Sequence, residues 1–311
     1  MSSARAKYVL ITAARNEEAF IARALESVTA QTHLPECWVI VDGGSTDRTT
    51  EIIEDFAEQY PWISLVRRVS RHDWRFEGKA SAINAGYKFL QKAHFDVIGN
   101  LDADISFEPD FMEFLMQRIS ADAQLGVVGA PYIEGDFDSA RDSFEGENFV
   151  DGRVQLFRRQ CFEEIGGYSK SRAGGIDWIA VMTARMKGWR VRSFAEKRII
   201  HHRTTDSAED GIFATYYSYG EKDYYLGSSP LWEICRVTFR AAKKPFLIGG
   251  LAVLCGYCRA AFTRMERPIS QELLRFHRHN QLKKLKRIFH SLLHFKKIDN
   301  FHLETTQTGA S

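Results

Sequence analysis

Short apolar runs alternate with stretches of helical periodicity over the first 130 residues. The apolar runs have the length and composition of buried strands at Tyr8–Ile11, Cys37–Val41, Ile63–Val66, Asp96–Leu101 and Leu125–Ala130. Between them, apolar residues recur at helical spacing over Glu17–Thr29, Thr50–Phe56, Lys79–Leu90 and Phe107–Ile119. This alternation predicts an α/β fold, with a mostly parallel, twisted sheet and helices on both of its faces.

The pattern changes after Pro131. A strand is expected at Val150–Phe157, helices at Arg158–Ile165 and Trp178–Met186, and a last strand ending at His201-His202. Beyond residue 209 the spacing is helical throughout. We therefore expect an α/β domain over residues 1–208, a helical region over 209–303 and a disordered polar tail over 304–311.

Composition and charge narrow the classes of function. With 44% hydrophobic residues and a net charge of +2, the 311-residue chain can bury a core and has no general attraction for nucleic acid. Five cysteines lack the spacing of a disulfide framework, and Met1–Lys7 does not look like a signal peptide, so we expect a reducing cytoplasm. For Cys255-x-x-Cys258 we favour a packed helix face, and leave redox or zinc chemistry open.

The last third of the chain has features of a membrane surface protein. Phe246–Phe262 is an apolar run of 17 residues, at the short limit for a transmembrane helix. Farther on, Gln271–Lys297 carries eight Lys/Arg and one Glu among leucines at helical spacing, which is typical of a helix lying on an anionic membrane. The alternative, helices that pack on the rest of the chain or on a second copy, stays open.

Asp102 and Asp104 are the strongest chemical signal. They follow an apolar run, and if that run is a strand, residues two apart point the same way. Neighbouring carboxylates repel each other, and a divalent cation such as Mg²⁺ or Mn²⁺ relieves the conflict while sharing its ligands with phosphates. A solvated Asp-Ala-Asp turn is the plainer alternative.

Other polar groups follow the ends of neighbouring strands. Ala13–Glu17 follows the first predicted strand and Asp42 the second, so both should lie at the carboxyl edge of the sheet together with Asp102 and Asp104. Ligands of open α/β sheets bind at that edge. No G-x-G-x-x-G motif follows the first strand, which disfavours a dinucleotide site.

These segments together resemble the inverting family 2 glycosyltransferases, which have the nucleotide-sugar-binding GT-A fold. The resemblance covers residues 8–202 and rests on motifs that occur in the family's order and spacing. They are Ile11–Glu18 (compare P-x-Y-N-E-E), Val41–Asp47 (V-D-D-G-S-T-D), Gly78–Gly86 (G-K-x-x-A-x-N-x-G), Asp102–Asp104 (D-x-D), Gly166–Tyr168 (G-G-[FY]), Ile176-Asp177 (E-D) and Gly188–Val191. It implies a nucleotide-binding half at 1–130 and an acceptor half at 131–208.

The resemblance also implies roles for single residues. A metal, Mn²⁺ or Mg²⁺, would be held by Asp104 with Asp102, completed by His201 or His202. The nucleotide sugar would be contacted by Ala13, Arg15, Asn16, Glu17, Asp42, Lys79 and Asp102. For Asn16, Glu17 and Asp42 a helix-capping role is the alternative, and for Lys79 a surface cation. Asp177 would be the general base, or else only the cap of the helix at Trp178, whose ring could stack on the acceptor sugar.

Several departures qualify the resemblance. Ala13 and Arg15 replace the family's Pro and Tyr, Gly43 replaces the second Asp of V-D-D, and Ile176 replaces the Glu of E-D. The Q-x-x-R-W element of the processive synthases is missing, which favours transfer of a single sugar.

The expected function is metal-dependent, inverting sugar transfer. A nucleoside-diphosphate sugar, with UDP favoured, would donate to a lipid-linked or glycan acceptor at the inner face of the cell membrane, in exopolysaccharide or cell-envelope synthesis. A nucleotidyltransferase with a similar sheet and a non-catalytic nucleotide-binding relative are the alternatives. Assembly into a homo-oligomer stays open.

Overall fold

The computed structural model describes residues 5–68, 76–142, 146–169, 171, 174–203, 211–241 and 246–294. The chain divides into two compact units, one of residues 1–172 and 176–203 and one of residues 173–175 and 204–311. We call them the α/β unit and the helical unit and describe each by itself. The tail expected to be disordered, Glu304–Ser311, lies outside the described residues.

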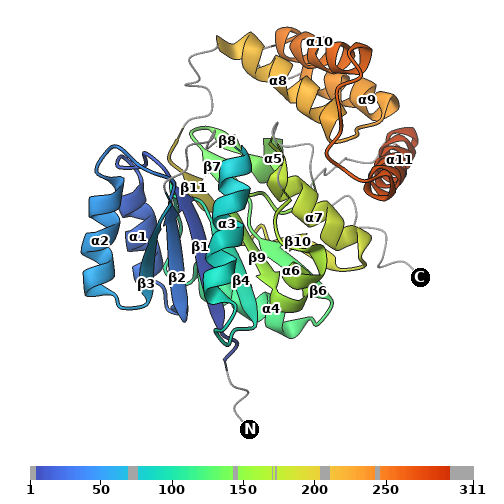
Figure 1. Ribbon diagram of the computed structural model, residues 1–311. Helices are drawn as coiled ribbons and strands as arrows, with labels where there is room; N and C mark the ends of the chain where they lie inside the picture. Colours follow the sequence, from blue (N-terminus) through green and yellow to red (C-terminus); the bar gives the residue numbers. More distant parts are fainter. Residues whose placement is uncertain are drawn as a thin grey trace. The chain divides into compact units, whose positions relative to one another are not determined.

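A seven-stranded sheet forms the centre of the α/β unit (Figure 1). Its strands are β1 (Tyr8–Ala14), β2 (Cys37–Asp42), β3 (Ile63–Arg67), β4 (Val97–Leu101), β6 (Leu125–Gly129), β9 (Val154–Arg158) and β10 (Arg190–Ser193), in the spatial order β10-β6-β9-β4-β1-β2-β3. Neighbours are parallel except β9, which is antiparallel to both β4 and β6. The prediction of a mostly parallel sheet is confirmed.

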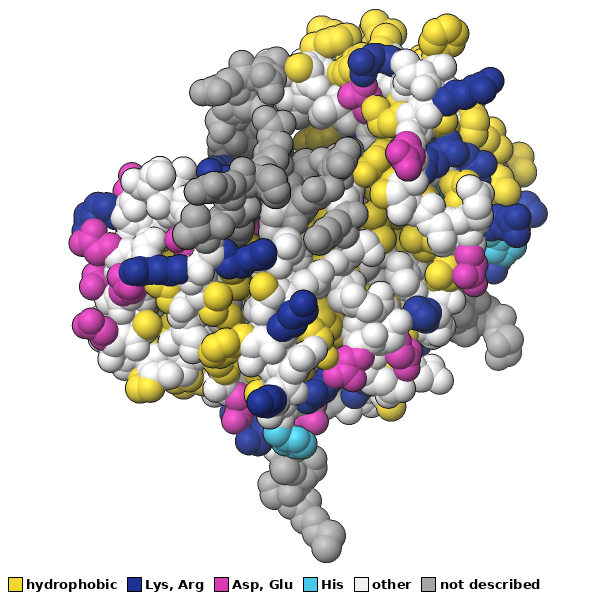
Figure 2. All heavy atoms as spheres, in the orientation of Figure 1, with side chains coloured by type: hydrophobic (Ala, Val, Ile, Leu, Met, Phe, Trp, Pro, Cys, Tyr) yellow, Lys and Arg dark blue, Asp and Glu magenta, His cyan; other side chains and the backbone are white. Residues whose placement is uncertain are grey.

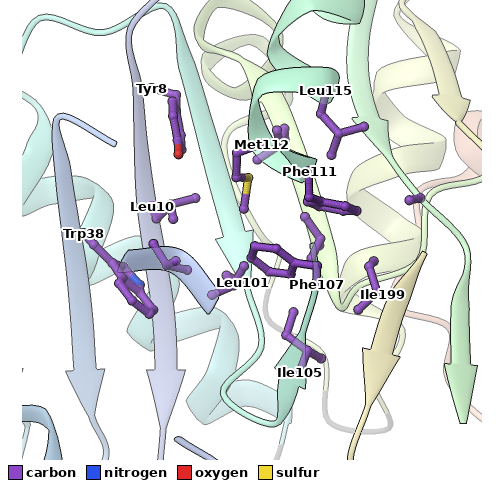
Figure 3. Close-up of a cluster of buried hydrophobic side chains, with 14 of the residues drawn as sticks. Tyr8, Leu10, Trp38, Leu101, Ile105, Phe107, Phe111, Met112, Leu115 and Ile199 are labelled. Carbon is purple, nitrogen blue, oxygen red and sulfur yellow. The ribbon is translucent and has the colours of Figure 1, made fainter. Parts of the chain in front are cut away.

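Helices cover both faces of this sheet. Their bounds are α1 (Ile21–Thr29), α2 (Thr49–Gln59) and α4 (Phe111–Ala121) on one face, and α3 (Phe76–Leu90), α6 (Arg159–Ile165) and α7 (Ile176–Met186) on the other. Alternate residues of β1 supply the two cores, because Tyr8 and Leu10 face α1 and α4 while Val9 and Ile11 face α3. Figure 3 shows the first core, where Leu10 and Trp38 lie with Phe107 and Phe111.

A second, four-stranded sheet lies beyond the carboxyl end of β4. It consists of β5 (Ile105–Ser106), β11 (Ile199–His201), β7 (Tyr132–Glu134) and β8 (Phe137–Asp138), in that spatial order, and α5 (Ser139–Asp142) follows β8. The single strand expected to end at His201-His202 is therefore wrong. β10 pairs with β6 in the large sheet, and after Phe194 enters the core the chain crosses over to form β11.

Three predicted elements begin four residues later than the sequence indicated. The helix expected from Glu17 begins at Ile21, and the one expected from Phe107 begins at Phe111, because the preceding residues form loops and the short β5. The strand expected from Val150 begins at Val154, because the Asp151 carboxylate accepts the backbone N–H of Arg153 at 3.1 Å and holds a turn there.

The helical unit contains α8 (Gly211–Tyr225), α9 (Pro230–Ala241), α10 (Ile248–Phe262) and α11 (Gln271–Leu293). The backbones of α8 and α10 approach closely, since a Cβ at Gly220 would collide with the backbone of Val253 and one at Gly256 with that of Tyr217. Ser270 caps α11 by accepting the N–H of Leu273 at 3.1 Å. The predicted helical character of this region is confirmed for its described residues.

The apolar run Phe246–Phe262 corresponds to α10, one face of which packs inside the helical unit. Within the described part of the chain, no helix is long and apolar enough to cross a membrane. The expectation that Cys255 and Cys258 belong to a packed helix face is wrong: both thiols are exposed, because α10 turns its glycine-containing face, not its cysteines, toward α8.

Candidate active site

Two loops at the carboxyl edge of the sheet are joined by side chains that accept backbone N–H groups. Asn16, which adopts a left-handed backbone conformation, accepts the N–H of Thr46 at 2.9 Å with its side-chain oxygen. The N–H of Glu17 donates to the hydroxyl of Thr49 at 2.7 Å. The side chain of Asn16 therefore joins the loops after β1 and β2 and does not cap α1, whose N-cap is Phe20. Its predicted contact with the nucleotide sugar stays a prediction.

Asp42, at the end of β2, is 4% exposed and bonds to its own loop. One carboxylate oxygen accepts the N–H and the hydroxyl of Ser45 at 3.0 and 2.6 Å, and the other accepts the Thr50 hydroxyl at 3.2 Å. The side chain thus shapes the turn before α2. Its predicted contact with a nucleoside stays a prediction.

Asp102 and Asp104 are not on a strand, because β4 ends at Leu101. Each has partners of its own: Asp102 accepts from the Lys79 ammonium at 2.5 Å, whereas Asp104 lies 3.3 Å from Nε2 of His201 and 3.1 Å from Nε of Arg203. The mutual repulsion expected of the pair is thus offset separately at each carboxylate.

The surroundings move the pKa values of the two acids in opposite directions. Burial raises the pKa of Asp102 despite the charge of Lys79. Burial also acts to raise the pKa of Asp104, but its hydrogen bonds with His201 and Arg203 outweigh this and lower the value to about 2. Asp104 is therefore a carboxylate at neutral pH, available to a cation.

The two adjacent histidines point to different partners. His201 lies between two carboxylates, with Nε2 toward Asp104 and Nδ1 2.6 Å from Glu134. The ring of His202 contacts the Ser106 hydroxyl at 2.8 Å and Arg23 at 3.0 Å. Of the two candidate metal ligands, the structure brings His201 to Asp104 and turns the His202 ring to other partners.

Asp104 and His201 supply some, but not all, of the ligands that a divalent cation needs. Nε2 of His201 and a carboxylate oxygen of Asp104 converge at 3.3 Å, and both are groups that bind Mn²⁺. No group of three or more potential ligands able to hold a metal occurs in the part of the chain described by the structure. A cation here would therefore take further oxygen ligands from a diphosphate, as Mg²⁺ commonly does.

Asp177 lies in the first turn of α7, packed against Gly152 so closely that a Cβ there would collide with it. Its backbone carbonyl accepts from Gln155 at 3.4 Å. Within the described residues no hydrogen-bond partner is found for its carboxylate. Trp178 beside it is half-buried.

Lys79 connects this carboxylate electrostatically with the acidic pair. Burial opposes its charge, but the carboxylates of Asp102, Asp177 and Asp104 outweigh that effect and raise the pKa of Lys79. All three acids therefore lie near one lysine. The resemblance implied that Lys79 contacts the nucleotide sugar, and in the structure it bonds to Asp102.

The G-K-x-x-A-x-N and G-G-Y motifs are hydrogen-bonded to each other. The side-chain amide of Asn84 on α3 donates to the carbonyl of Tyr168 at 2.7 Å and accepts its N–H at 3.1 Å. The Tyr168 hydroxyl donates to Gln155 at 2.5 Å, and Gln155 contacts the backbone of Asp177. The G-K-x-x-A-x-N and G-G-Y segments thus form the support behind Asp177.

The first-strand loop presents three further candidates. Ala13 is half-buried near the end of β1, and Arg15 is exposed with no hydrogen-bond partner among the described residues. Glu17 is bonded to Arg203, yet burial is the larger effect and raises its pKa to about 7.

Sequence reasoning missed Glu134, Arg153 and Arg203. Arg153 stacks 3.5 Å above the Tyr132 ring and bonds to Asp151 at 2.8 Å and Glu134 at 3.3 Å, so it fixes the carboxylate that holds His201. Arg203 bridges Glu17 and Asp104. The position of Arg203 directly after His201-His202 could have indicated that it belongs to the site. Nothing in the sequence around Glu134 indicates a role for that residue.

Comparison with known proteins identifies the class. The family model for glycosyl transferase family 2 matches residues 9–182, which is more than half of the chain. The fold resembles that of GT-A glycosyltransferases. The chain therefore belongs to glycosyl transferase family 2, and it has the GT-A fold.

Among sequence relatives, it is 34% identical over 182 residues to the beta-monoglucosyldiacylglycerol synthase of Synechocystis sp., covering 52% of this chain and 36% of that one. It is 30% identical over 171 residues to the poly-beta-1,6-N-acetyl-D-glucosamine synthase of Staphylococcus epidermidis, covering 55% and 37%. The chain thus matches little more than a third of the length of these curated relatives.

Two solved structures show the similarity of fold. The mannosyltransferase PcManGT from Pyrobaculum calidifontis, in complex with GDP-Man and Mn²⁺, has a TM-score of 0.56 at 20% identity and covers 84% of this chain and 76% of its own. Residues 1–349 of TarS from S. aureus, in complex with UDP-GlcNAc, give a TM-score of 0.52 at 14% identity, covering 97% of this chain and 92% of that fragment.

Proposed function

We propose that this protein transfers one sugar, with inversion, from a nucleoside-diphosphate sugar to a hydroxyl group of a lipid-linked or glycan acceptor. The observation that carries the proposal is the arrangement around Lys79. Lys79 bonds to Asp102 and is influenced electrostatically by Asp104 and by Asp177, whose carboxylate has no hydrogen-bond partner among the described residues.

On the donor side, Asp104 and His201 would hold a divalent cation, Mn²⁺ or Mg²⁺, which when bound neutralises the charge of a leaving diphosphate. Asp102, held by Lys79, would orient the ribose or the diphosphate. The exposed Arg15 would stack on the base or meet a phosphate. The two solved neighbours contain GDP-Man and UDP-GlcNAc, which supports a nucleotide sugar as donor.

On the acceptor side, the Asp177 carboxylate would take the proton of the attacking hydroxyl as the new bond forms. Gly152 and Gln155 hold the residue in place. A base opposite the leaving group inverts the anomeric centre, so that an α-linked donor gives a β-linked product. Both relatives named above are synthases of beta-linked products by name, which supports this stereochemistry.

The acceptor is proposed to be presented at a membrane, with the protein bound peripherally to the inner face. The name of the Synechocystis relative specifies a diacylglycerol product. In this chain, exposed apolar and basic side chains of the helical unit support the same proposal.

Calorimetric titration of UDP, GDP, CDP and dTDP, with and without Mn²⁺, tests the donor site. We expect one nucleotide to bind more tightly with Mn²⁺, and this gain to be lost in Asp104→Ala. The variant Asp136→Ala, an exposed acid between β7 and β8, is the matched control and should bind like the parent protein.

Two results would contradict the proposal. Absence of binding for every nucleotide would favour a non-catalytic relative. Release of diphosphate from a nucleoside triphosphate, with the nucleotide joined to a sugar phosphate, would favour nucleotidyl transfer, which the family match already makes the weaker alternative.

A further inference from the structure

One face of α10 is a continuous stripe of exposed apolar and thiol side chains. We define the α10 stripe as Leu247, Ile248, Leu251, Cys255, Cys258 and Phe262. Leu247 directly precedes the helix, and from Ile248 onward a spacing of three or four residues places the side chains on one side of it. Leu251 is 56% exposed and Phe262 is 91% exposed.

The opposite face of α10 is buried within the helical unit. Gly249, Gly250, Ala252, Val253, Gly256, Tyr257 and Ala260 are buried. The close approach to α8 at Gly256 and the bond from the Tyr257 hydroxyl to the carbonyl of Ser228 at 2.8 Å hold this face in place. With one side fixed and the other side apolar except for Arg259, which is paired with Glu221, α10 is suited to lie along a surface.

The charge of the helical unit indicates which surface this is. Its described residues, 211–241 and 246–294, contain twelve Lys/Arg and five Asp/Glu. Lys283 and Lys286 on α11 and Arg264 after α10 are exposed and have no side-chain hydrogen bond or ion pair with the described residues. Figure 2 shows dark blue basic side chains beside yellow apolar ones over these helices. Such a combination fits an anionic lipid bilayer.

We propose that the α10 stripe enters the interfacial layer of an anionic membrane, with the α11 lysines contacting the lipid headgroups. The inference rests on the proposed membrane-presented acceptor and adds to it the face that contacts lipid. Partitioning would combine the burial of apolar area with about a fivefold contribution from each lysine.

Two thiols within the stripe make a direct test possible with the full, unmodified chain. A membrane-impermeant maleimide should label Cys255 and Cys258 in the free protein. Vesicles of phosphatidylcholine with phosphatidylglycerol should bind the protein and protect both thiols, as measured by peptide mass spectrometry. Vesicles of phosphatidylcholine alone should bind and protect much less.

Variants separate the apolar and the charged contributions in vesicle sedimentation. Leu251→Gln should weaken binding about tenfold, while Phe89→Gln, which alters a side chain 60% exposed on α3, should change nothing. Lys283→Gln with Lys286→Gln should weaken binding to anionic vesicles by more than tenfold. Lys88→Gln with Lys92→Gln, two exposed lysines of the α/β unit, is the matched control.

Three results would overturn the inference. They are failure of the parent protein to bind anionic vesicles, vesicle-bound protein whose two thiols react as fast as in solution, and protection without lipid that grows with protein concentration. The last result would show that a second copy covers the stripe, and light scattering would then report a dimer. Nucleotide titration is independent of vesicles, so failure of this inference and failure of the proposed sugar transfer are distinguishable.

Discussion

The α/β unit buries charged side chains together with partners, whereas the helical unit exposes apolar ones and buries a carboxyl that has none. Around Asp104, the imidazole of His201 and the guanidinium of Arg203 share the carboxylate, and a second acid, Glu134, holds the imidazole. In the helical unit, Glu233 is 1% exposed, and neither of its oxygens has a hydrogen-bond partner among the described residues.

The two units therefore differ in how they place charged and apolar side chains, and this affects what each unit can bind. Paired charges in a low-dielectric site keep a fixed geometry, which suits the binding of a charged donor. An exposed apolar face and an unpaired buried carboxyl give no such precision, and they make the behaviour of the helical unit depend on its surroundings and on pH. The predictions below test each side of the comparison.

The largest effect is expected for the base in the α/β unit. Asp177→Asn should lower kcat at least about 10²-fold, because the amide cannot accept the acceptor's proton. Nucleotide binding should not change, because Lys79 is ion-paired with Asp102 and makes no described hydrogen bond to Asp177. Steady-state kinetics with calorimetry measures both quantities.

Asp55→Asn, on the exposed side of α2, is the matched control for the change of charge and should leave kcat unchanged. Near-normal turnover in Asp177→Asn would remove this residue as base and leave it the role of stabilising the first turn of α7.

A smaller effect is expected for the acid that holds His201. Glu134→Gln should weaken Mn²⁺ binding, measured calorimetrically in the presence of UDP, by about 10- to 100-fold, which is typical when the partner of a metal-binding histidine is lost. His202→Gln should leave Mn²⁺ affinity unchanged, since that ring bonds to Ser106 and Arg23. Equal losses in both variants would indicate a general disturbance of β11 and contradict the role given to Glu134.

Local periodicity predicted most elements of the fold, because both faces of the large sheet are buried and its strands are long apolar runs. The short strands of the second sheet were not predicted. β5, β7 and β8 have two or three residues each, too few to show a period, and their pairing depends on distant segments.

The candidate site was predictable where its residues follow strand ends, as Asp42 and Asp102 do. For Asp104, the resemblance indicated His201 or His202 as a neighbour. The bonds from Lys79 to Asp102 and from Arg203 to Asp104 were not predicted, because they join residues far apart in the sequence. The expected sharing of one cation by Asp102 and Asp104 presumed a strand that in fact ends at Leu101. Only the three-dimensional structure shows which neutralising partner each acid has.

The packing of the helical unit can be tested at a single glycine. Gly256→Ala should lower the free energy of unfolding of this unit by about 1–3 kcal/mol, because the added methyl group collides with the backbone of Tyr217 on α8. Gly249→Ala on the same helix is the matched control, since its methyl group would make an ordinary contact with Arg240 at 3.4 Å. The control should stabilise slightly through helix propensity. Urea unfolding followed by circular dichroism distinguishes the two.

The last prediction concerns the unpaired carboxyl of Glu233, whose burial raises its pKa from 4.5 to about 8. Between these values the folded protein keeps a proton that the unfolded chain has lost, so the free energy of unfolding falls by about 1.4 kcal/mol for each pH unit gained. Glu233→Gln should remove this slope, matching the parent protein near pH 4.5 and exceeding its stability above pH 7. Glu272→Gln, at the exposed start of α11, should keep it. Unfolding curves at several pH values measure this difference. Parallel pH profiles for the parent protein and Glu233→Gln would mean that the carboxyl is ionised and paired in the folded protein. The two units would then not differ in how they bury charge.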